Sequence, residues 1–327
     1  MLARRDFLSL SLLGLAVPSL AYAEPRSRVV EVFKGARGTS ITLSLEHAPF
    51  PAPNAGYRDS TVMLFVPRYF RADGAVQTVV HFHGYKNSVE TAVHKHQLRE
   101  QLYDSKQNAV LIVPQLALFA ADTNAGKLQQ QGGFARMVQN ALQTAAASGK
   151  AQVAMGDSAL PRRPRIGTVC ISAHSGGYHA AACALKYGGV EISETYLFDA
   201  LYSDVEVFRE WVLARRSKTV GRRHKIISYY TAGVTEQNTR TLFAALEKSK
   251  VSTALENVEG TLSRKQITLS QAVAIKTQTS HGAVTSQHNQ LRDCLFASSL
   301  RRSVRSNWFD AKNGARQLDE RPPSKRN

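Results

Sequence analysis

Apolar residues along this chain gather in short runs, each bounded by Gly, Pro or a polar cluster. Runs of this length and spacing are typical of buried β-strands. Some of them, such as Ala109 to Pro114, show no polar alternation, which favours strands that are covered on both faces. The pattern predicts strands at residues 61–67, 76–82, 109–114, 165–171, 195–198, 225–230 and 273–276.

The segments between these runs have helical composition. The first of them opens with Ser88, which can act as an N-cap, and carries Glu90 in its first turn, where a carboxylate is favourable. The composition predicts helices at residues 88–102, 134–147, 178–185, 205–214, 238–249 and 286–300.

Strands and helices therefore alternate from Thr61 to Leu300. Alternation of this kind predicts an α/β fold with a mostly parallel central sheet and helices on both faces. No Pro-, Gly- or Ser-rich linker interrupts the pattern, so we expect one domain over residues 24–300, followed by a basic tail at 301–327. Residues 117–133 are rich in Gln, Gly and Asn without periodicity, and loops of this length often line a site.

The composition is that of a globular protein, with 43% hydrophobic and 20% charged residues, which excludes a disordered, collagen-like or coiled-coil chain. The three cysteines form no CxxC pair, which excludes a disulfide-dense scaffold and makes a structural zinc site improbable. Cys170 lies in a strand and is expected to be buried filler. Cys183 and Cys294 lie on predicted helices and could form a bridge in an oxidising compartment.

The N-terminus reads as a signal peptide. Arg4 and Arg5 precede an apolar run, and Ala21-Tyr22-Ala23 supplies a small-x-small cleavage pattern, so we expect cleavage after Ala23. Arg-Arg-Asp-Phe-Leu resembles the twin-arginine signal, with an ordinary Sec signal as the alternative. Removal of residues 1–23 changes the formal net charge from +17 to +16. We expect a soluble protein in the bacterial periplasm or medium.

The strongest chemical signal is Ile171-Ser172-Ala173-His174-Ser175-Gly176-Gly177, which follows a predicted strand and precedes an Ala-rich helix. A nucleophile on a sharp strand-to-helix turn needs small residues two before and two after it, because the strained backbone brings neighbouring atoms close. Ala173 and Gly177 meet this need around Ser175, although the usual pattern, G-x-S-x-G, has Gly at the first of them. The alternative role for Ser172 or Ser175 is a helix N-cap.

With this turn, the chain resembles the α/β-hydrolase superfamily over residues 60 to 295. Its second mark is His83-Gly84-Tyr85, which ends the apolar strand upstream of the serine. The resemblance implies that backbone N–H groups of Gly176 and of Tyr85, or Gly84, form an oxyanion hole. Fixed dipoles of this kind stabilise the charged tetrahedral intermediate without reorganisation.

The resemblance also implies a histidine base on a loop after the last strand. His281, in Thr279-Ser280-His281-Gly282, occupies that place, and His288 is the alternative. An imidazole has the pKa that suits proton transfer near neutral pH.

The acid is expected at Asp199, directly after the strand that follows the nucleophile helix. Pancreatic-type lipases are the precedent for this position, whereas most members of the superfamily take the acid from the next strand. That alternative points to Glu236, and Asp204 is a third candidate. A helix N-cap would be the purely structural role of Asp199.

The histidine pairs His81/His83 and His94/His96 could suggest metal binding. However, His81 lies in a predicted buried strand and lacks the following Asp-His of two-metal hydrolases, and His94 and His96 do not share a helical face. We therefore expect no metal and no cofactor, and we expect His81 and His83 to support the oxyanion loop. Three basic clusters, at residues 162–165, 215–218 and 222–225, contain no interleaved aromatics and match no nucleic-acid module. They predict a solvated basic surface or electrostatic association with anionic envelope components.

The sequence thus predicts an exported serine hydrolase that cleaves a small-molecule or polymeric carboxylic ester through an acyl-enzyme. Ser175, His281 and Asp199 would be its catalytic residues. An amidase or peptidase of the same fold is one alternative, because these motifs do not separate esters from amides. A non-catalytic module that binds the envelope through its basic surface is the other.

Overall fold

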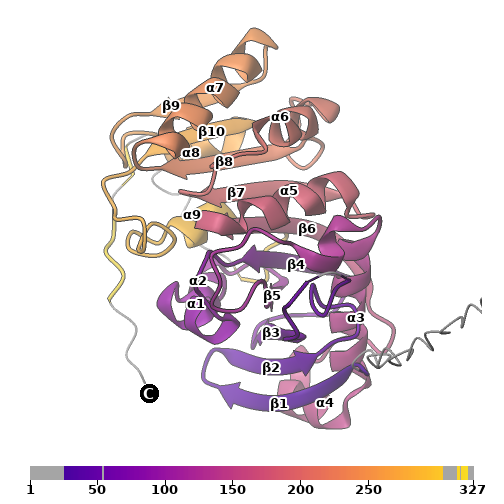
Figure 1. Cartoon of the computed structure of the whole chain (residues 1–327). Coiled ribbons are helices and arrows are strands. Elements are labelled where there is room, and N and C mark those ends of the chain that lie inside the picture. The colour runs from indigo at the N-terminus through magenta and orange to yellow at the C-terminus, as the bar shows by residue number, and fades with distance from the viewer. Residues whose placement is uncertain (1–25, 54, 305–314, 317, 323–327) are drawn as a thin grey trace, which may run out of the picture.

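The computed structural model describes residues 26–53, 55–304, 315–316 and 318–322. Within them, ten strands form one sheet in the order β1-β2-β3-β5-β4-β6-β7-β8-β10-β9. Figure 1 shows this sheet running from β1 at the bottom to β9 at the top. The strands are β1 (Arg28–Gly35), β2 (Gly38–Ser44), β3 (Thr61–Pro67), β4 (Ala75–Phe82), β5 (Ala109–Pro114), β6 (Arg165–His174), β7 (Ile192–Phe198), β8 (Lys225–Tyr230), β9 (Thr253–Glu256) and β10 (Ala272–Lys276).

The pairing divides the sheet into two parts. Strands β1, β2, β3 and β5 pair antiparallel in that order, and every pair from β5 through β4, β6, β7, β8 and β10 to β9 is parallel. The mostly parallel sheet that the alternation predicted is therefore confirmed. The carboxyl ends of β4, β6 and β7 consequently lie at one edge of the sheet, where the residues that follow them can meet.

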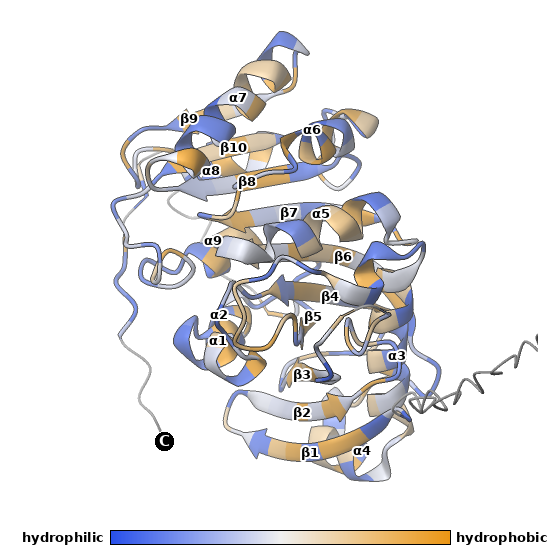
Figure 2. Ribbon diagram, in the orientation of Figure 1, coloured by the Kyte–Doolittle hydropathy of each residue, from blue (hydrophilic) through white to orange (hydrophobic). Residues whose placement is uncertain are grey.

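Helices cover both faces, as predicted. One face packs against α3 (Gly133–Ala147), α4 (Gly149–Met155), α5 (Tyr178–Tyr187), α6 (Val205–Ala214) and α7 (Val234–Lys248). The other face packs against α1 (Val89–Lys95), α2 (Leu98–Ser105), α8 (Arg264–Leu269) and α9 (Gln290–Phe296). In Figure 2, α6 and α7 carry both orange and blue residues, as expected for helices with one buried side.

Strand residues divide between the two cores by alternation. In β5, Val110 and Ile112 enter the core under α3, whereas Leu111 and Val113 enter the core under α1 and α2. Because successive side chains of a strand point to opposite faces, an all-apolar strand is what a sheet covered on both sides requires. The apolar run that predicted β5 thus matches its position inside the sheet.

Several elements were not predicted, and others were drawn too long. The hairpin of β1 and β2 lies before Thr61, where the sequence pattern predicted no element, because β1 has mostly exposed or half-buried residues. Strand β9 and helices α4 and α8 are short and were also missed. The helix expected at 286–300 is confined to α9, since the chain before Gln290 forms turns and Asn289 has φ of 61°.

The helix expected at 88–102 is two helices. Ser88 caps α1 as predicted, because its hydroxyl accepts a hydrogen bond from the Thr91 N–H at 3.1 Å. The helix then ends at His96, and Gln97 adopts a left-handed conformation with φ of 47° before α2 begins. Neither Gly nor Pro marks this break, so the composition gave no signal of it.

Parts of the basic tail are built into the fold. Arg316 is buried, and its guanidinium pairs with the buried carboxylate of Glu256 at 2.7 Å. Its backbone N–H donates to the Gly260 carbonyl at 2.7 Å, and Arg321 pairs with Asp104 at 2.7 Å. The segment around Arg316 therefore contributes to the structure rather than only to its charge.

The structure shows the state of the three cysteines. All three cysteines are free and buried, and Cys183 and Cys294 belong to the cores on opposite faces of the sheet, so the bridge between them is not formed. Cys170, in β6, is buried in the core, as expected.

None of the helices among the described residues has the length and apolarity needed to cross a bilayer.

We predict that Arg316→Met lowers the free energy of unfolding by about 3–5 kcal/mol, because it leaves the buried Glu256 carboxylate without its cation. Urea denaturation followed by circular dichroism measures the change. The double variant Arg316→Met/Glu256→Leu is the control, and it should recover most of the loss. If the single and double variants were equally destabilised, the unpaired charge would not be the cause.

Candidate functional site

Ser175 lies on the sharp turn between β6 and α5. Strand β6 ends at His174, Ser175 adopts φ of 52°, and a single 3₁₀ turn over Ser175–Gly177 leads into α5. A positive φ is costly for a residue other than Gly, and such strain is typical of functional turns. A Cβ on Gly177 would lie 2.4 Å from the Phe82 carbonyl oxygen. The small residue at this position is therefore required, as the sequence pattern suggested.

The structure brings Ser175, His281 and Asp199 together in one hydrogen-bonded chain. Ser175 Oγ and His281 Nε2 are 2.9 Å apart, and His281 Nδ1 and Asp199 Oδ2 are 2.7 Å apart. With Nδ1–H donating to the carboxylate, Nε2 is left to accept the serine proton. The His281 side chain is 44% exposed and that of Asp199 is 3% exposed, so the imidazole reaches the solvent and the carboxylate lies beneath it.

Asp199 is held in place by several donors. Its carboxylate accepts hydrogen bonds from the Thr231 N–H, the Thr231 hydroxyl and the Thr235 hydroxyl, at 3.1, 2.9 and 2.5 Å. Burial by itself raises the pKa of Asp199, but the hydrogen bonds from His281, Thr235 and Thr231 outweigh it and lower the pKa to about 2. The carboxylate is therefore ionised and fixed in orientation, as an acid that supports an imidazolium must be.

The alternative acids and the alternative base lie elsewhere. Glu236 is in the first turn of α7 and pairs with Arg240 and Lys276. Asp204 pairs with His179 at 2.7 Å. His288 lies 3.6 Å from Glu259. None of these three side chains has a described contact with Ser175 or His281.

The loop that follows β4 lies against the serine. A Cβ on Gly84 would be 2.8 Å from Ser175 Cβ, and a Cβ on Gly176 would be 2.3 Å from the Tyr85 ring. Of the three residues considered for the oxyanion hole, Gly84 therefore packs directly against Ser175, and the Tyr85 ring packs against Gly176, which follows Ser175 in the chain.

His83 fixes the orientation of this loop. Its Nδ1–H donates to the Gly84 carbonyl at 2.8 Å, while Nε2 accepts from the Leu116 N–H at 3.0 Å and the Gln115 amide at 2.9 Å. In a trans peptide the C=O and the following N–H point in opposite directions. By holding the Gly84 carbonyl, His83 thus sets the direction of the Tyr85 N–H. The sequence predicted that His83 supports this loop, but not which atoms it contacts.

A row of buried histidines lies behind His281. His174 Nε2–H donates to the His281 carbonyl at 2.8 Å, and its ring is 4.9 Å from the His281 ring. The His96 ring follows at 4.6 Å, and the His81 ring lies 6.1 Å beyond it. His81 Nδ1 also hydrogen-bonds Ser172 Oγ at 2.8 Å. The residue before the nucleophile therefore ties the loop of the candidate base to β6, a role that the sequence did not reveal.

Aromatic side chains surround the open side of the site. Tyr85 and Tyr202 are 42% and 39% exposed, and Tyr178 lies 6.1 Å from Tyr202 between ring centroids. The Tyr202 ring is 6.4 Å from the His281 ring. The loop at 117–133 also borders this region, because Phe119 and Ala120 hydrogen-bond the backbone of Asn87 and Lys86.

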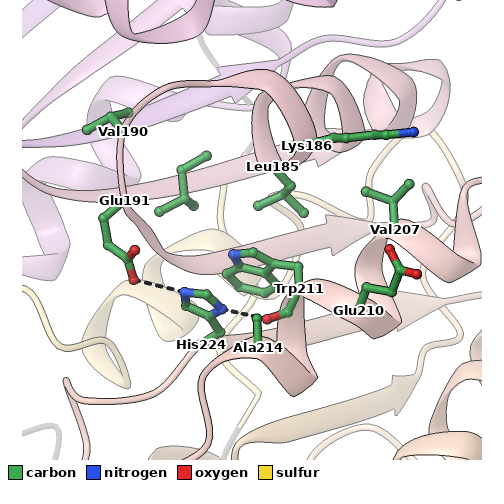
Figure 3. A pocket seen from close by; sticks show the side chains of 10 residues that line it. Leu185, Lys186, Val190, Glu191, Val207, Glu210, Trp211, Ala214 and His224 are labelled. Atoms are coloured by element: carbon green, nitrogen blue, oxygen red, sulfur yellow. Dashed lines mark hydrogen bonds and ion pairs between the residues drawn. The ribbon is translucent and has the colours of Figure 1, made fainter. Parts of the chain in front are cut away.

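A separate pocket of 330 Å³ lies where β7 and β8 begin, at the sheet edge opposite Ser175 (Figure 3). Trp211 stacks on His224 there with ring centroids 4.5 Å apart, and His224 hydrogen-bonds Glu191 at 2.8 Å. Ser175, Asp199 and His281 do not line this pocket.

Within the described residues, the side chains of His, Cys, Asp and Glu form no group of three or more that could hold a metal ion. His81 and His96 are neighbours, but His81 Nε2 and both nitrogens of His96 lack hydrogen-bond partners.

Three observations identify the fold. They are the strand order, the strained turn at the end of β6, and the chain order Ser175, Asp199, His281 at the carboxyl edge of the sheet. The chain has the α/β-hydrolase fold. Asp199, the candidate acid, follows β7, the strand directly after α5.

No protein-family model matches the sequence, and no curated protein sequence matches it. Among solved structures, the chain is similar to an S-formylglutathione hydrolase from Agrobacterium tumefaciens, with 11% identity over 83% of this chain and 98% of that chain and a TM-score of 0.46. It is similar to the fluorophosphonate-binding serine hydrolase FphF of Staphylococcus aureus, with 10% identity, 80% and 99% coverage and a TM-score of 0.45. It is similar to a feruloyl esterase module from Clostridium thermocellum, with 12% identity, 84% and 87% coverage and a TM-score of 0.43.

The buried histidines predict a loss of stability in mild acid. Burial lowers the pKa of His83 and His174 to about 4, and lowers that of His81 and His96 well below the ordinary value. The unfolded chain takes up these protons below about pH 6.5, whereas the folded chain does not. The free energy of unfolding should therefore be fully present above pH 6.5 and fall towards pH 4, by about 1.4 kcal/mol per pH unit for each imidazole.

Urea denaturation at a series of pH values between 7.5 and 4 (roughly the window in which imidazoles titrate) measures this slope. His96→Leu should reduce the slope by about one proton, because it removes one buried imidazole. The Asp199 carboxylate affects stability at lower pH. Its contribution to the free energy of unfolding is fully present above its ordinary pKa and is lost only as the pH falls towards 2. A free energy of unfolding that stayed constant from pH 6.5 to 4 would contradict the prediction.

Proposed function

We propose that this protein is a serine hydrolase that cleaves carboxylic esters through a covalent acyl-enzyme. The observation that carries the proposal is the hydrogen-bonded chain from Ser175 Oγ through His281 to the buried carboxylate of Asp199. A serine, a neutral imidazole and an orienting acid in this geometry are the parts that activate a hydroxyl for acyl transfer.

In the first half of the reaction, Ser175 Oγ attacks the ester carbonyl carbon while His281 Nε2 takes the hydroxyl proton. Asp199 stabilises the resulting imidazolium through the Nδ1–H hydrogen bond. The tetrahedral intermediate then breaks its bond to the alcohol oxygen, and the imidazolium returns the proton to that oxygen. The alcohol leaves, and the acyl group remains on Ser175.

In the second half, water attacks the acyl carbon, with His281 as the base that accepts its proton. The carboxylic acid is released, and Ser175 recovers its hydroxyl proton from the imidazolium. In both halves the backbone N–H groups of Gly176 and Tyr85 would stabilise the oxyanion, since both residues border Ser175 and His83 orients the Gly84–Tyr85 peptide. No cofactor or metal takes part in this scheme.

The surroundings of the site support an ester with an apolar or aromatic part. The Tyr202 ring lies beside His281, Tyr178 lies next to Tyr202, and the Tyr85 ring lies against Gly176. Rings of this kind bind apolar groups and other rings. The exposed position of His281 is compatible with either a small molecule or the ester of a larger polymer. Cleavage of amides by the same residues is the alternative activity.

The place of action remains a proposal. The predicted signal peptide, residues 1–23, lies outside the described residues, and so does its cleavage after Ala23. A basic exported protein would meet anionic envelope components after it leaves the cytoplasm. We therefore propose that the enzyme acts in the periplasm or outside the cell.

We expect the protein to hydrolyse p-nitrophenyl esters faster than aminoacyl p-nitroanilides, and to be labelled at Ser175 by a fluorophosphonate. Ser175→Ala should lose the label and lower kcat by about 10⁴-fold or more, because the nucleophile is gone. Activity assays and mass spectrometry of the labelled peptide measure both effects.

Ser172→Ala serves as the matched control, since Ser172 is a buried serine of the same strand that bonds His81 instead of His281. It should keep the label. A folded protein without an adduct at Ser175 would contradict the hydrolase proposal and favour a non-catalytic envelope-binding module. Faster cleavage of the anilides would favour the amidase alternative.

The identity of the acid is tested by Asp199→Asn and Glu236→Gln. We expect Asp199→Asn to lower kcat by about 10⁴-fold, because a neutral amide neither stabilises the imidazolium nor selects its tautomer. Glu236→Gln should keep kcat within about twofold, because Glu236 pairs with Arg240 and Lys276 at the surface. Full activity of Asp199→Asn would show that another carboxylate serves as the acid.

A further inference from the structure

Arginines gather where the parallel strands begin. Arg162 and Arg163 precede β6, Arg165 is its first residue, and Arg222 precedes β8. All four are exposed, whereas Arg223 and Lys225 of the third basic cluster are buried and donate to backbone carbonyls. The tertiary structure thus buries part of the third cluster, whereas the arginines of the first cluster all lie at the surface.

Contacts through Asn108, at the start of β5, add two more arginines to this edge. The Asn108 N–H donates to the Arg301 carbonyl at 2.6 Å, and its side chain exchanges two hydrogen bonds of 2.9 Å with the Arg71 backbone. The Arg301 guanidinium pairs with Asp73, which lies just before β4. Arg71 and Arg301 are therefore neighbours across the beginnings of β4 and β5.

Two further contacts connect these residues with β6 and β8. A Cβ on Gly74, beside Asp73, would lie 4.0 Å from Arg165 Nη2. A Cβ on Gly221 would lie 3.5 Å from Ser299 Cβ, which places Arg222 close to the start of the 301–302 segment. We call the exposed arginines of this region the basic edge, which consists of Arg71, Arg162, Arg163, Arg165, Arg222, Arg301 and Arg302.

The basic edge and the candidate site lie at opposite ends of the same strand. Strand β6 runs from Arg165 to His174, directly before Ser175. Ten residues of extended chain span about 30 Å. The surface that carries the positive charge is therefore remote from the surface that would receive the substrate.

We propose that the basic edge docks the protein onto a membrane surface rich in anionic phospholipid, with Ser175 facing away from the bilayer. The guanidinium group matches phosphate oxygens through paired N–H donors, which favours phosphate-bearing ligands. The edge crosses the beginnings of neighbouring strands rather than lining a groove, so it suits an extended sheet of headgroups. Val304, which is 44% exposed, follows Arg302 and adds an apolar side chain at the same place.

This orientation has a consequence for the proposed hydrolase. A protein held by the basic edge would present Tyr85 and Tyr202 to the solvent on the side away from the lipid. The substrate would then be a soluble or polymer-bound ester, and the docked lipid would not itself be the substrate. The docking proposal nevertheless stands on the arginines alone and does not require that the protein be an enzyme.

The experiment is co-sedimentation of the full chain with vesicles. We expect binding to vesicles of phosphatidylcholine with phosphatidylglycerol, and this binding should weaken as salt is added. Vesicles of phosphatidylcholine alone measure the contribution of apolar residues, including the run at residues 7–20. The triple variant Arg162→Gln/Arg163→Gln/Arg165→Gln should bind the anionic vesicles about 100-fold more weakly, at about fivefold for each arginine.

The matched control is Arg26→Gln/Arg28→Gln/Arg136→Gln, which removes the same charge from exposed residues at the beginning of β1 and on α3. It should bind within about threefold of the original protein, because charges beyond a Debye length contribute little. Both triple variants should hydrolyse a soluble ester at the original rate, so a failed docking test and a failed hydrolase test are distinguishable.

Equal losses in the two triple variants would overturn the proposal, because overall charge and not the basic edge would then govern binding. Absence of binding to the anionic vesicles would overturn it as well. Binding to duplex DNA with the same dependence on Arg162, Arg163 and Arg165, but not to vesicles, would assign the edge to a nucleic acid instead.

Discussion

The turn between β6 and α5 is the constraint on which the site depends. Ser175 holds its positive φ only because Gly177 can approach the Phe82 carbonyl and Gly84 can approach Ser175 itself. These contacts lock the ends of β4 and β6 together, so the oxyanion loop and the candidate nucleophile are placed by one packing event. Strain at such a turn is tolerated because the sheet on either side is buried and densely paired.

The base and the acid are positioned by buried polar groups. His174 ties the His281 loop to β6 through a backbone carbonyl. Thr231, which follows β8, and Thr235, in α7, hold the Asp199 carboxylate. Buried polar groups are costly unless they are paired, and the unpaired nitrogens of His96 show that part of this cost persists behind the site. The groups that position the candidate site are therefore the same groups that we expect to make the fold sensitive to acid.

Charge is distributed separately from this chemistry. The carboxyl ends of the parallel strands lie at the candidate site, and their beginnings lie at the basic edge. The two surfaces are therefore separated by the length of the strands. The overall charge of +17 described a basic protein without saying where the charge lies. Burial of Arg223, Lys225 and Arg316 removes some of these cations from the surface, and the strand beginnings gather others.

The sequence by itself determined the alternation of strands and helices and the turn around Ser175, because short apolar runs and small residues are local signals. It also indicated His281 and Asp199 by their places after strands. It did not determine the break at Gln97, because no Gly or Pro marks that backbone conformation. It did not determine the hairpin before Thr61, because an exposed strand leaves no apolar run, or the role of His174, because a long-range hydrogen bond leaves no local pattern. The choice of Asp199 over Glu236 was likewise made only by the tertiary structure, which brings one carboxylate to His281 and leaves the other paired with Arg240 and Lys276.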